Sequence, residues 1–297
     1  GHGAAYYASQ DDGDDQIRSN IIMGSAAAKG RDNTHRLEAG MNVIIGVDAL
    51  KYVESGTSEK RVIIGAQAGG GSLAGSANCV VGTGCVIVGQ DAFGSNGASA
   101  DTSLSASTLV GNRAARNLVT GTSHTIIGYG AAQGTGSFDR SIVIGTEAGE
   151  NFASDDCVII GTTAAKDMTG GDKAILIGAK AGEKHLGTGS VMIGYKAGWA
   201  TTNAASNYNT YIGYESGYSA GVTATADSNV GVGAYTLDAL STGDDNVAVG
   251  FEALSANATG TDNTAIGYQA GLLYVGSLMT AVGASAGGGI TTHMGDG

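Results

Sequence analysis

The chain of 297 residues has no proline and only three cysteines, and aromatic residues make up 6% of it. Without proline the sequence cannot form a collagen-like triple helix, although 52 residues are glycine. The cysteines (Cys79, Cys85 and Cys157) are too few and too irregularly spaced for a disulfide framework or a zinc site. No apolar run reaches the roughly 18 residues of a membrane-spanning helix.

Positive charge is also scarce, with 15 basic against 27 acidic residues and a net charge of -12. The basic residues form no stripe along the sequence, so nucleic acid is not an expected partner. The first twenty residues lack the basic and apolar regions of a signal peptide. Apolar residues make up 42% of the chain, which favours a folded core over disorder.

What the chain does contain is a repeat centred on glycine, as in "VIIGAQAG" from residue 62 and "DNTAIGYQAG" from residue 262. From Gly111 to Gly194 the copies follow one another every 16 or 17 residues, and elsewhere the step reaches 24. A repeat this short predicts one small unit stacked on the next. The fifteen motif glycines are Gly24, Gly46, Gly65, Gly89, Gly111, Gly128, Gly145, Gly161, Gly178, Gly194, Gly213, Gly233, Gly250, Gly267 and Gly283.

The positions around each glycine predict the local structure. Valine or isoleucine precedes it in fourteen copies, and a branched residue stands three before it in most copies, so the triplet before the glycine is read as a short β-strand. The glycine itself supplies a turn with positive φ. Alanine stands three residues after the glycine in thirteen copies, replaced by Ser216 and Thr236, and fits a tight inner corner.

These features predict an all-β protein, a parallel β-solenoid of about 15 coils over residues 21–287. Residues 1–20 are expected to be a connector or cloning remnant and 288–297 a tail, and the whole is expected to be a piece of a longer protein. The inserts at 93–107, 199–209 and 217–228 are predicted to be loops.

Period-two alternation predicts opposite faces for neighbouring residues of each triplet. The residue before the glycine is assigned to the solenoid core, as in Ile144, Ile160, Ile177, Ile193, Ile212 and Ile266. The middle residue is assigned to the outside, where a row of large apolar side chains must be covered by other copies of the chain. That predicted interface comprises Ile44, Ile63, Ile87, Leu109, Ile126, Val143, Ile159, Leu176, Met192 and Tyr211. The alternative is a wider solenoid with all three positions inside.

After residue 230 the middle position becomes small: Gly231, Ala248, Ala265 and Ala281. If the middle row faces outward, this change predicts either a closer approach of the chains or the end of the covered region.

The copies "DNTAIGYQAG", "DDNVAVGFEAL" and "GSVMIGYKAG" resemble the repeats in the heads of trimeric autotransporter adhesins, and still more the "NTAIGYQAG" repeats of bacteriophage tail fibres. Over residues 20 to 287 the resemblance implies a left-handed parallel β-roll and a parallel homotrimer. It also implies a rigid receptor-binding or spacer element. The longer period, and the lack of a neck, stalk and membrane anchor, favour the phage fibre over the adhesin.

The expected function is therefore attachment, as a phage tail fibre segment in the virion. Expected partners are other copies of the chain, a bacterial surface glycan or outer-membrane receptor, and other tail or fibre proteins. The alternatives are an autotransporter head on the bacterial surface and a purely structural fibre shaft. An ice-binding solenoid would require a flat regular array of threonines, whereas the threonines here are scattered.

An aromatic cluster provides the candidate receptor or glycan site. Flat rings stack on sugar faces, and nearby amides can donate and accept hydrogen bonds. The candidates are Trp199, Tyr208, Tyr214 and Tyr218 with Asn207 and Asn209; the alternative is a local core that anchors the loops. A second set, Tyr129, Tyr195, Tyr214, Phe251 and Tyr268, follows the motif glycine directly and is interpreted as a structural ladder.

No metal, cofactor or catalytic site is predicted. The acidic stretches "DDGDD" (11–15) and "STGDDN" (241–246) lack a calcium-binding signature. His2, His35, His124, His185 and His293 have no partner pattern for a triad or a metal. The chain is expected not to be an enzyme, although paired carboxylates in a groove between subunits, as in a depolymerising tailspike, stay open at the level of sequence.

Overall fold

The computed structural model describes residues 20–28, 40–51, 60–70, 79–94, 102–134, 136–199, 206–218 and 225–289. The acidic stretch 11–15, His2, His35, His293 and most of both predicted terminal segments lie outside these residues. The chain forms two compact units, an N-terminal unit (Gly1–Asn151) and a C-terminal unit (Phe152–Gly297). Among the described residues there is no helix long and apolar enough to cross a membrane.

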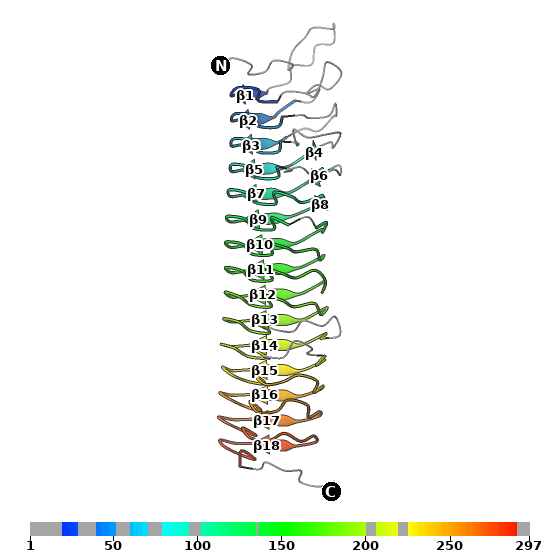
Figure 1. Cartoon of the computed structure of the whole chain (residues 1–297), viewed down its shortest axis with the longest axis vertical. Helices are drawn as coiled ribbons and strands as arrows, with labels where there is room; N and C mark the ends of the chain where they lie inside the picture. The colour runs from blue at the N-terminus through cyan, green and yellow to red at the C-terminus, as the bar shows by residue number, and fades with distance from the viewer. Residues whose placement is uncertain are drawn as a thin grey trace. The chain divides into compact units, whose positions relative to one another are not determined.

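The N-terminal unit contains a parallel sheet of seven short strands and, beside it, a second sheet of three (Figure 1). The main sheet has the order β1-β2-β3-β5-β7-β9-β10: β1 Ile21–Met23, β2 Val43–Ile45, β3 Val62–Ile64, β5 Val86–Val88, β7 Thr108–Val110, β9 Thr125–Ile127 and β10 Ile142–Ile144. The second sheet has the order β4-β6-β8: β4 Cys79–Val81, β6 Thr102–Ser105 and β8 Thr120–Thr122. Part of the predicted 93–107 loop is therefore strand.

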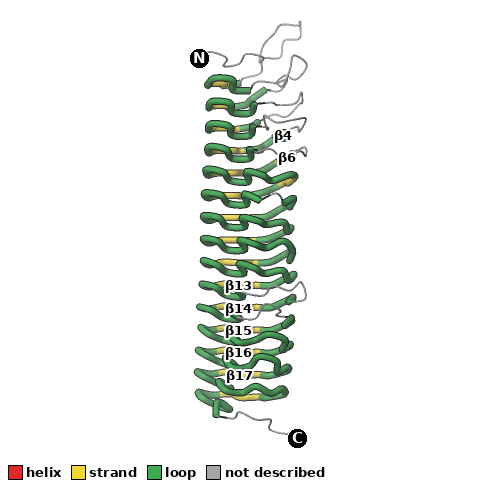
Figure 2. Tube along the Cα trace, viewed as in Figure 1, coloured by secondary structure: helices red, strands yellow, loops and turns green. Residues whose placement is uncertain are grey.

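The C-terminal unit contains eight strands in sequence order, one in each coil (Figure 2). They are β11 Val158–Ile160, β12 Ile175–Ile177, β13 Val191–Ile193, β14 Thr210–Ile212, β15 Val230–Val232, β16 Val247–Val249, β17 Thr264–Ile266 and β18 Thr280–Val282. Like residues pair with like: Leu176 of β12 pairs with Met192 of β13, which in turn pairs with Tyr211 of β14. The prediction of an all-β parallel β-solenoid is confirmed for both units.

The middle residue of each triplet points into the coil, so the predicted facing of the strands is wrong. All ten residues assigned to an outward interface, from Ile44 to Tyr211, are buried within the single chain, with at most 2% of their surface exposed. The residues assigned to the core lie on the outer face instead: Ile266 is 41% exposed, and Ile144, Ile160, Ile177, Ile193 and Ile212 are half-buried.

The alternation itself holds, but in the opposite phase. The residue four before the motif glycine is buried together with the middle residue, while the first and third strand residues face outward, as the pattern of β11 shows. The middle residue and the residue before the glycine are both apolar in nearly every copy, so hydrophobicity alone did not distinguish the inner from the outer row.

The motif glycine has the predicted positive φ and a second, stronger reason to be glycine. Its φ is 143° at Gly213 and 136° at Gly233, a region that side chains rarely adopt. A β-carbon at Gly213 would also overlap the backbone carbonyl of Gly233 in the next coil. The alanine three residues later is buried, as predicted, and its N–H points back to the glycine carbonyl in a tight turn, for example from Ala181 to Gly178.

In the coils of β12 to β16, core volume is balanced between the middle residue and the residue four after the glycine. There the large middle residues Leu176, Met192 and Tyr211 are matched by a glycine: Gly182, Gly198 and Gly217. Where the middle residue shrinks to Gly231 or Ala248, buried Leu237 and Leu254 occupy the partner position. The small residues after 230 therefore reflect packing inside the coil, and the prediction that they mark a change in contacts between chains is wrong.

Candidate functional site

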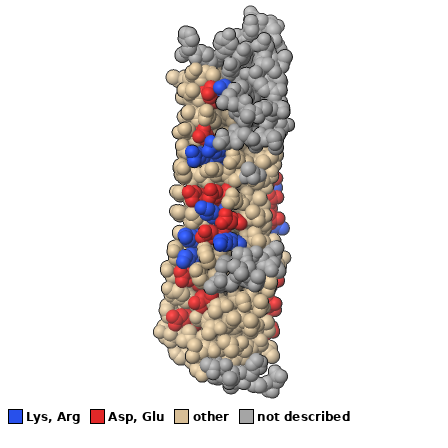
Figure 3. All heavy atoms as spheres, in the orientation of Figure 1, with Lys and Arg blue, Asp and Glu red and all other residues tan. Residues whose placement is uncertain are grey.

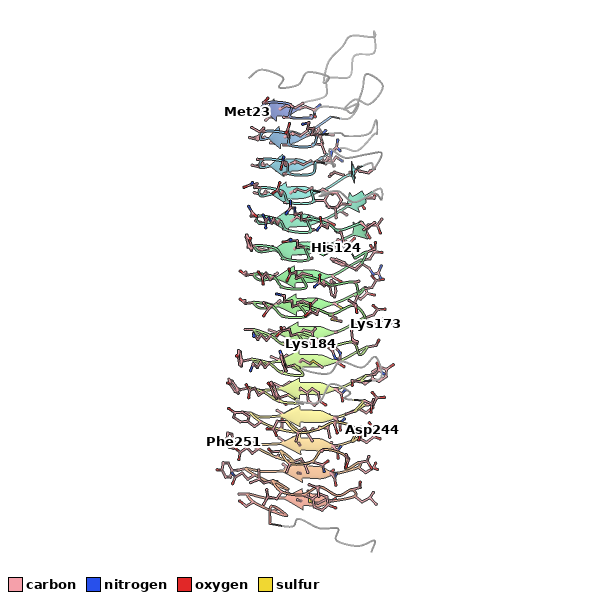
Figure 4. The ribbon with its side chains drawn as sticks, viewed as in Figure 1. Met23, His124, Lys173, Lys184, Asp244 and Phe251 are labelled. Carbon is pink, nitrogen blue, oxygen red and sulfur yellow. The ribbon has the colours of Figure 1, made fainter. Side chains whose placement is uncertain are left out.

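The six predicted receptor-binding residues do not form one cluster, because the strand β14 separates them. Asn207 and Tyr208 lie before the strand, at the end of the coil where Figure 4 places Asp244. Tyr214 and Tyr218 follow the strand, at the end where Figure 4 places Phe251. Asn209 is buried and hydrogen-bonded inside the coil, so its side chain is not available to a ligand.

The aromatic residues after the strands do come together. The rings of Trp199 and Tyr218 stack with centroids 5.2 Å apart and an interplanar angle of 9°. The ammonium of Lys196 lies 5.2 Å from the Tyr218 centroid and 5.9 Å from that of Trp199. Trp199 also donates its indole N–H to Glu183 over 2.7 Å. The cation–π contacts of Lys196 and the hydrogen bond to Glu183 stabilise this arrangement of the two rings.

Beside this pair runs a continuous column of rings, which we call the aromatic column. It contains Tyr195, Tyr214, Tyr235, Phe251 and Tyr268, with successive centroids 5.1, 5.4, 5.9 and 5.6 Å apart. In one coil the residue after the motif glycine is Ala234, and Tyr235 at the next position fills the gap. The predicted ladder therefore exists, with Tyr235 added to it. Tyr129, the other predicted member, lies in the N-terminal unit and is not part of this column.

The opposite end of the coils carries a ladder of short polar side chains that accept backbone hydrogen bonds. Asp227 accepts from the N–H of Asn207, and Asp244 accepts from the N–H of Asp227 over 2.8 Å. In the N-terminal unit Asp139 accepts from the N–H of Thr122 over 2.8 Å. Asp244 of the 241–246 stretch thus accepts a backbone hydrogen bond within this ladder. No group of three potential metal-binding side chains occurs among the residues that the structure describes.

A second ladder, inside the coils, was missed by the sequence analysis. It is formed by the residues four before the motif glycine, and we call it the polar ladder. In the C-terminal unit the carbonyl oxygen of each asparagine side chain accepts from the backbone N–H of the next: Asn209 from Asn229, Asn229 from Asn246, and Asn246 from Asn263, over 2.9–3.1 Å. The buried amides are thus satisfied, as burial requires. The recurring asparagine at this position was the available signal.

Other polar residues occupy the same ladder position. In the N-terminal unit these include Arg61, which donates to Asn42 and to the carbonyl of Val81. Burial lowers the pKa of the Arg61 guanidinium to about 10. Cys157 is a buried thiol at this position, and burial raises its pKa to about 11. Such a thiol is mostly protonated at neutral pH and poorly reactive.

Of the five histidines considered for catalysis, two lie in the part of the chain that the structure describes, and both are buried. His124 packs against the ring of Phe138, with centroids 4.5 Å apart. Burial lowers the pKa of His185 to about 4, so this imidazole is neutral at pH 7. Both side chains contribute to the interior of a coil.

The outer face of the main parallel sheet is uniform in composition. Its two rows, the first and third residues of each strand, are defined here as the flanking rows. In both units they contain only valine, isoleucine and threonine, apart from Met23, and no charged residue. None of these side chains is fully buried, and Ile127, Ile142, Ile175 and Ile266 are 37–41% exposed. On the face shown in Figure 3, lysines and arginines lie among acidic residues and form no continuous basic stripe.

Comparison with known proteins gives no further guide to the site. No protein-family model matches the chain, and no curated protein and no solved structure shows significant similarity to it.

Proposed function

We propose that the protein is a self-associating attachment fibre segment, in which the solenoids of three copies lie side by side and parallel. The observation that supports this most directly is the uncharged outer face formed by the flanking rows. Soluble monomers rarely expose a continuous apolar surface of this extent. A covering partner removes it from water.

A second copy of the chain fits this face better than an unrelated protein does. Each parallel strand contributes one valine, isoleucine or threonine to each flanking row, so the rows repeat at the spacing of the strands. A partner that matches such a surface over many coils needs the same repeat, and a parallel copy has it. Closed symmetry around a common axis then buries the face on every copy. The motif resemblance given above favours three copies and a left-handed coil.

For the biological role we favour a bacteriophage tail fibre that attaches the virion to a bacterial surface glycan or outer-membrane receptor. The support is the resemblance of the repeat to tail-fibre sequences and the stacked, short-period fold, which suits a stiff element. Three identical weak sites on one fibre would bind a dense surface by avidity. This role is one of binding, without catalysis.

Sedimentation velocity of the purified chain tests the association. We expect a mass of three chains at micromolar concentration, and a single-chain mass would contradict the proposal. Ile177→Asp places a charge in a flanking row and should give folded monomers with an unchanged circular dichroism spectrum. Tyr208→Asp adds a charge at an exposed position outside the sheet and should leave the trimer intact.

Co-sedimentation of the labelled protein with bacterial cells tests attachment. We expect the wild-type trimer to be retained on at least one strain of a broad panel and the Ile177→Asp monomer to be lost on washing. A trimer retained on no strain would point instead to a structural shaft.

A further inference from the structure

The coil of β18 is less completely filled than the coils before it. In the coils of β12 to β16, either the middle residue or the residue four after the motif glycine is large, whereas here the two are Ala281 and Gly287. A cavity of about 410 Å³ lies at this coil, and we call it the end socket. Its lining comes from this one coil and has no charged side chain: Tyr274, Leu278, Met279, Thr280, Ala281, Val282, Ala286 and Gly287.

The coil of β17 has the same deficit and shows what fills it. There the two positions are Ala265 and Gly271. The side chain of Met279, which belongs to the following coil, occupies the space: a β-carbon at Gly271 would lie 2.5 Å from its Cε. Met279 stands four before its motif glycine and is the only large apolar residue at that position of the repeat. A large apolar side chain at the same position of an added strand would fill the end socket in the same way.

The strand β18 also has an open edge. It is the last strand in the order of the main sheet (Figure 1). In the preceding coil the N–H groups of Thr264 and Gly271 donate to carbonyl groups of the β18 coil, over 2.7 and 2.8 Å. Among the residues that the structure describes, the equivalent N–H groups of Thr280 and Gly287 have no such backbone acceptor. A strand that satisfies both of them must run parallel to β18 and in register with it.

The motif glycine of this coil leaves room for such a strand. A β-carbon at Gly267 would overlap the carbonyl oxygen of Gly283 in the next coil, whereas the nearest atom to a β-carbon at Gly283 is Cβ of Ala286, at 4.0 Å. The space that a following backbone takes at Gly267 is therefore open at Gly283. Beside it, Leu278 and Val282 are 71% and 68% exposed.

We propose that the end socket binds an extended strand of another protein chain, which adds to β18 in parallel and inserts one large apolar side chain. Hydrogen bonds from the main chain of Thr280 and Gly287 hold the strand, and the socket selects the inserted side chain. The precedent of Met279 gives the chemistry of this anchor, a residue of the size of methionine or leucine four before a glycine. The anchor is uncharged, because no side chain of the lining could compensate a buried charge.

The source of the strand follows from the same position. A second copy that stacked end to end through its first coil would bring Asn20 to the anchor position, and an amide cannot replace the apolar side chain. A strand from a different chain is therefore the better fit. This inference concerns one end of the C-terminal unit and does not rest on the lateral assembly proposed above.

Fluorescence anisotropy of a labelled peptide with the sequence of residues 274–289 tests the proposal on the full-length chain. This peptide is the one copy of the repeat that carries an apolar anchor, Met279. We expect saturable binding of one peptide per chain. A peptide with Met279→Asp should bind more weakly by roughly tenfold or more, because the anchor would bury a charge.

Two variants of the protein locate the site. Ala281→Leu fills the end socket from within, as Leu176 fills the space at Gly182, and should also weaken binding by roughly tenfold or more. Leu273→Ala removes an exposed side chain of the same coil that does not line the socket, and should bind like the wild type. Circular dichroism checks that both variants are folded, and the aspartate peptide tests the anchor on the wild-type protein without any change to its fold.

The proposal is overturned if the wild type binds no peptide, if the aspartate peptide binds as tightly, or if folded Ala281→Leu binds unchanged. Binding that appears only after residues 290–297 are removed would assign the socket to the chain's own end, against the proposal. Solenoids joined end to end in electron micrographs would assign it to a second copy, with the same consequence. The Ile177→Asp variant should bind the peptide like the wild type, so a failure of the lateral assembly is seen separately.

Discussion

The ring of Tyr211 lies directly against the backbone of Gly217, six residues later in the same coil. A β-carbon at residue 217 would lie 2.5 Å from Cγ and Cδ2 of that ring. The same relationship links Leu176 with Gly182 and Met192 with Gly198. In these three coils the large middle side chain therefore fills the space that a side chain at the glycine position would need.

Substitution Gly217→Ala should destabilise the C-terminal unit by about 3 kcal/mol. Overpacking of a filled core costs about 1–3 kcal/mol, and the φ of 61° at this position adds about 1 kcal/mol for a residue with a side chain. Urea denaturation followed by circular dichroism measures the loss. The double variant with Tyr211→Leu should recover part of it.

Gly130→Ala is the matched control for that experiment. Its φ is 62°, but a β-carbon there would meet only Oε1 of Gln133 at 3.2 Å and Cγ of Glu147 at 3.7 Å. The expected cost is about 1 kcal/mol, from the backbone alone. Equal losses for Gly130→Ala and Gly217→Ala would mean that ring packing is not what excludes a side chain at residue 217.

Because neighbouring residues of β12 face opposite sides of the sheet, the same substitution at each should have opposite effects on folding. Leu176 is fully buried, so Leu176→Asp should unfold the surrounding coils, with a loss above about 4 kcal/mol. Ile175→Asp, at a residue 37% exposed, should keep the circular dichroism spectrum and act on association alone. Thermal denaturation distinguishes the two. A folded Leu176→Asp protein would contradict the assignment of the middle row to the core.

The polar ladder should be as important to stability as the apolar core. Asn246→Ala removes the acceptor for the N–H of Asn263 and leaves the side-chain oxygen of Asn229 with fewer donors. Unsatisfied buried groups cost about 1–3 kcal/mol each, so we expect a loss of about 3 kcal/mol in urea denaturation. Asn246→Ser should lose less, because Ser190 already accepts the N–H of Asn209 at the equivalent position. A serine variant as unstable as the alanine variant would argue against the acceptor role.

Acid should destabilise the coil that contains His185. Its pKa is lowered by burial from 6.5 to about 4, so below pH 6.5 the unfolded chain binds a proton that the folded chain excludes. The stabilisation from keeping His185 neutral is fully present above pH 6.5 and is lost as the pH falls towards 4. The loss amounts to about 3 kcal/mol at most.

Thermal midpoints between pH 7 and pH 4.5 measure this effect, with His185→Gln as the reference. The wild-type midpoint should fall more steeply with acid than that of the variant, because carboxylates titrate equally in both proteins. Parallel curves would show that His185 makes no contribution to the acid sensitivity.

Much of the fold followed from the repeat. The run from Val191 to Ala197 gave the strand, the glycine turn and the inner alanine correctly, because each has a steric requirement that only a few residue types meet. The strands β4, β6 and β8 were missed, since "CVV", "TSLS" and "TGT" do not carry the motif. The predicted aromatic site was right only in part: proximity in sequence placed Tyr208 with Tyr214, although β14 puts them at opposite ends of the coil.

By itself the sequence determined the stacking of like residues, because the motif glycine recurs with the same kinds of neighbours in each copy and leaves one in-register arrangement. Only the tertiary structure decided which way the strands face. Ile159 and Ile160 are the same residue type, but Ile159 is buried and Ile160 is half-buried. The turns close the coil over the side of the strand that Ile159 faces. The same closure made Asn209 an inner ladder residue and left Tyr214 on an open column, since a side chain's environment depends on the coil that encloses it.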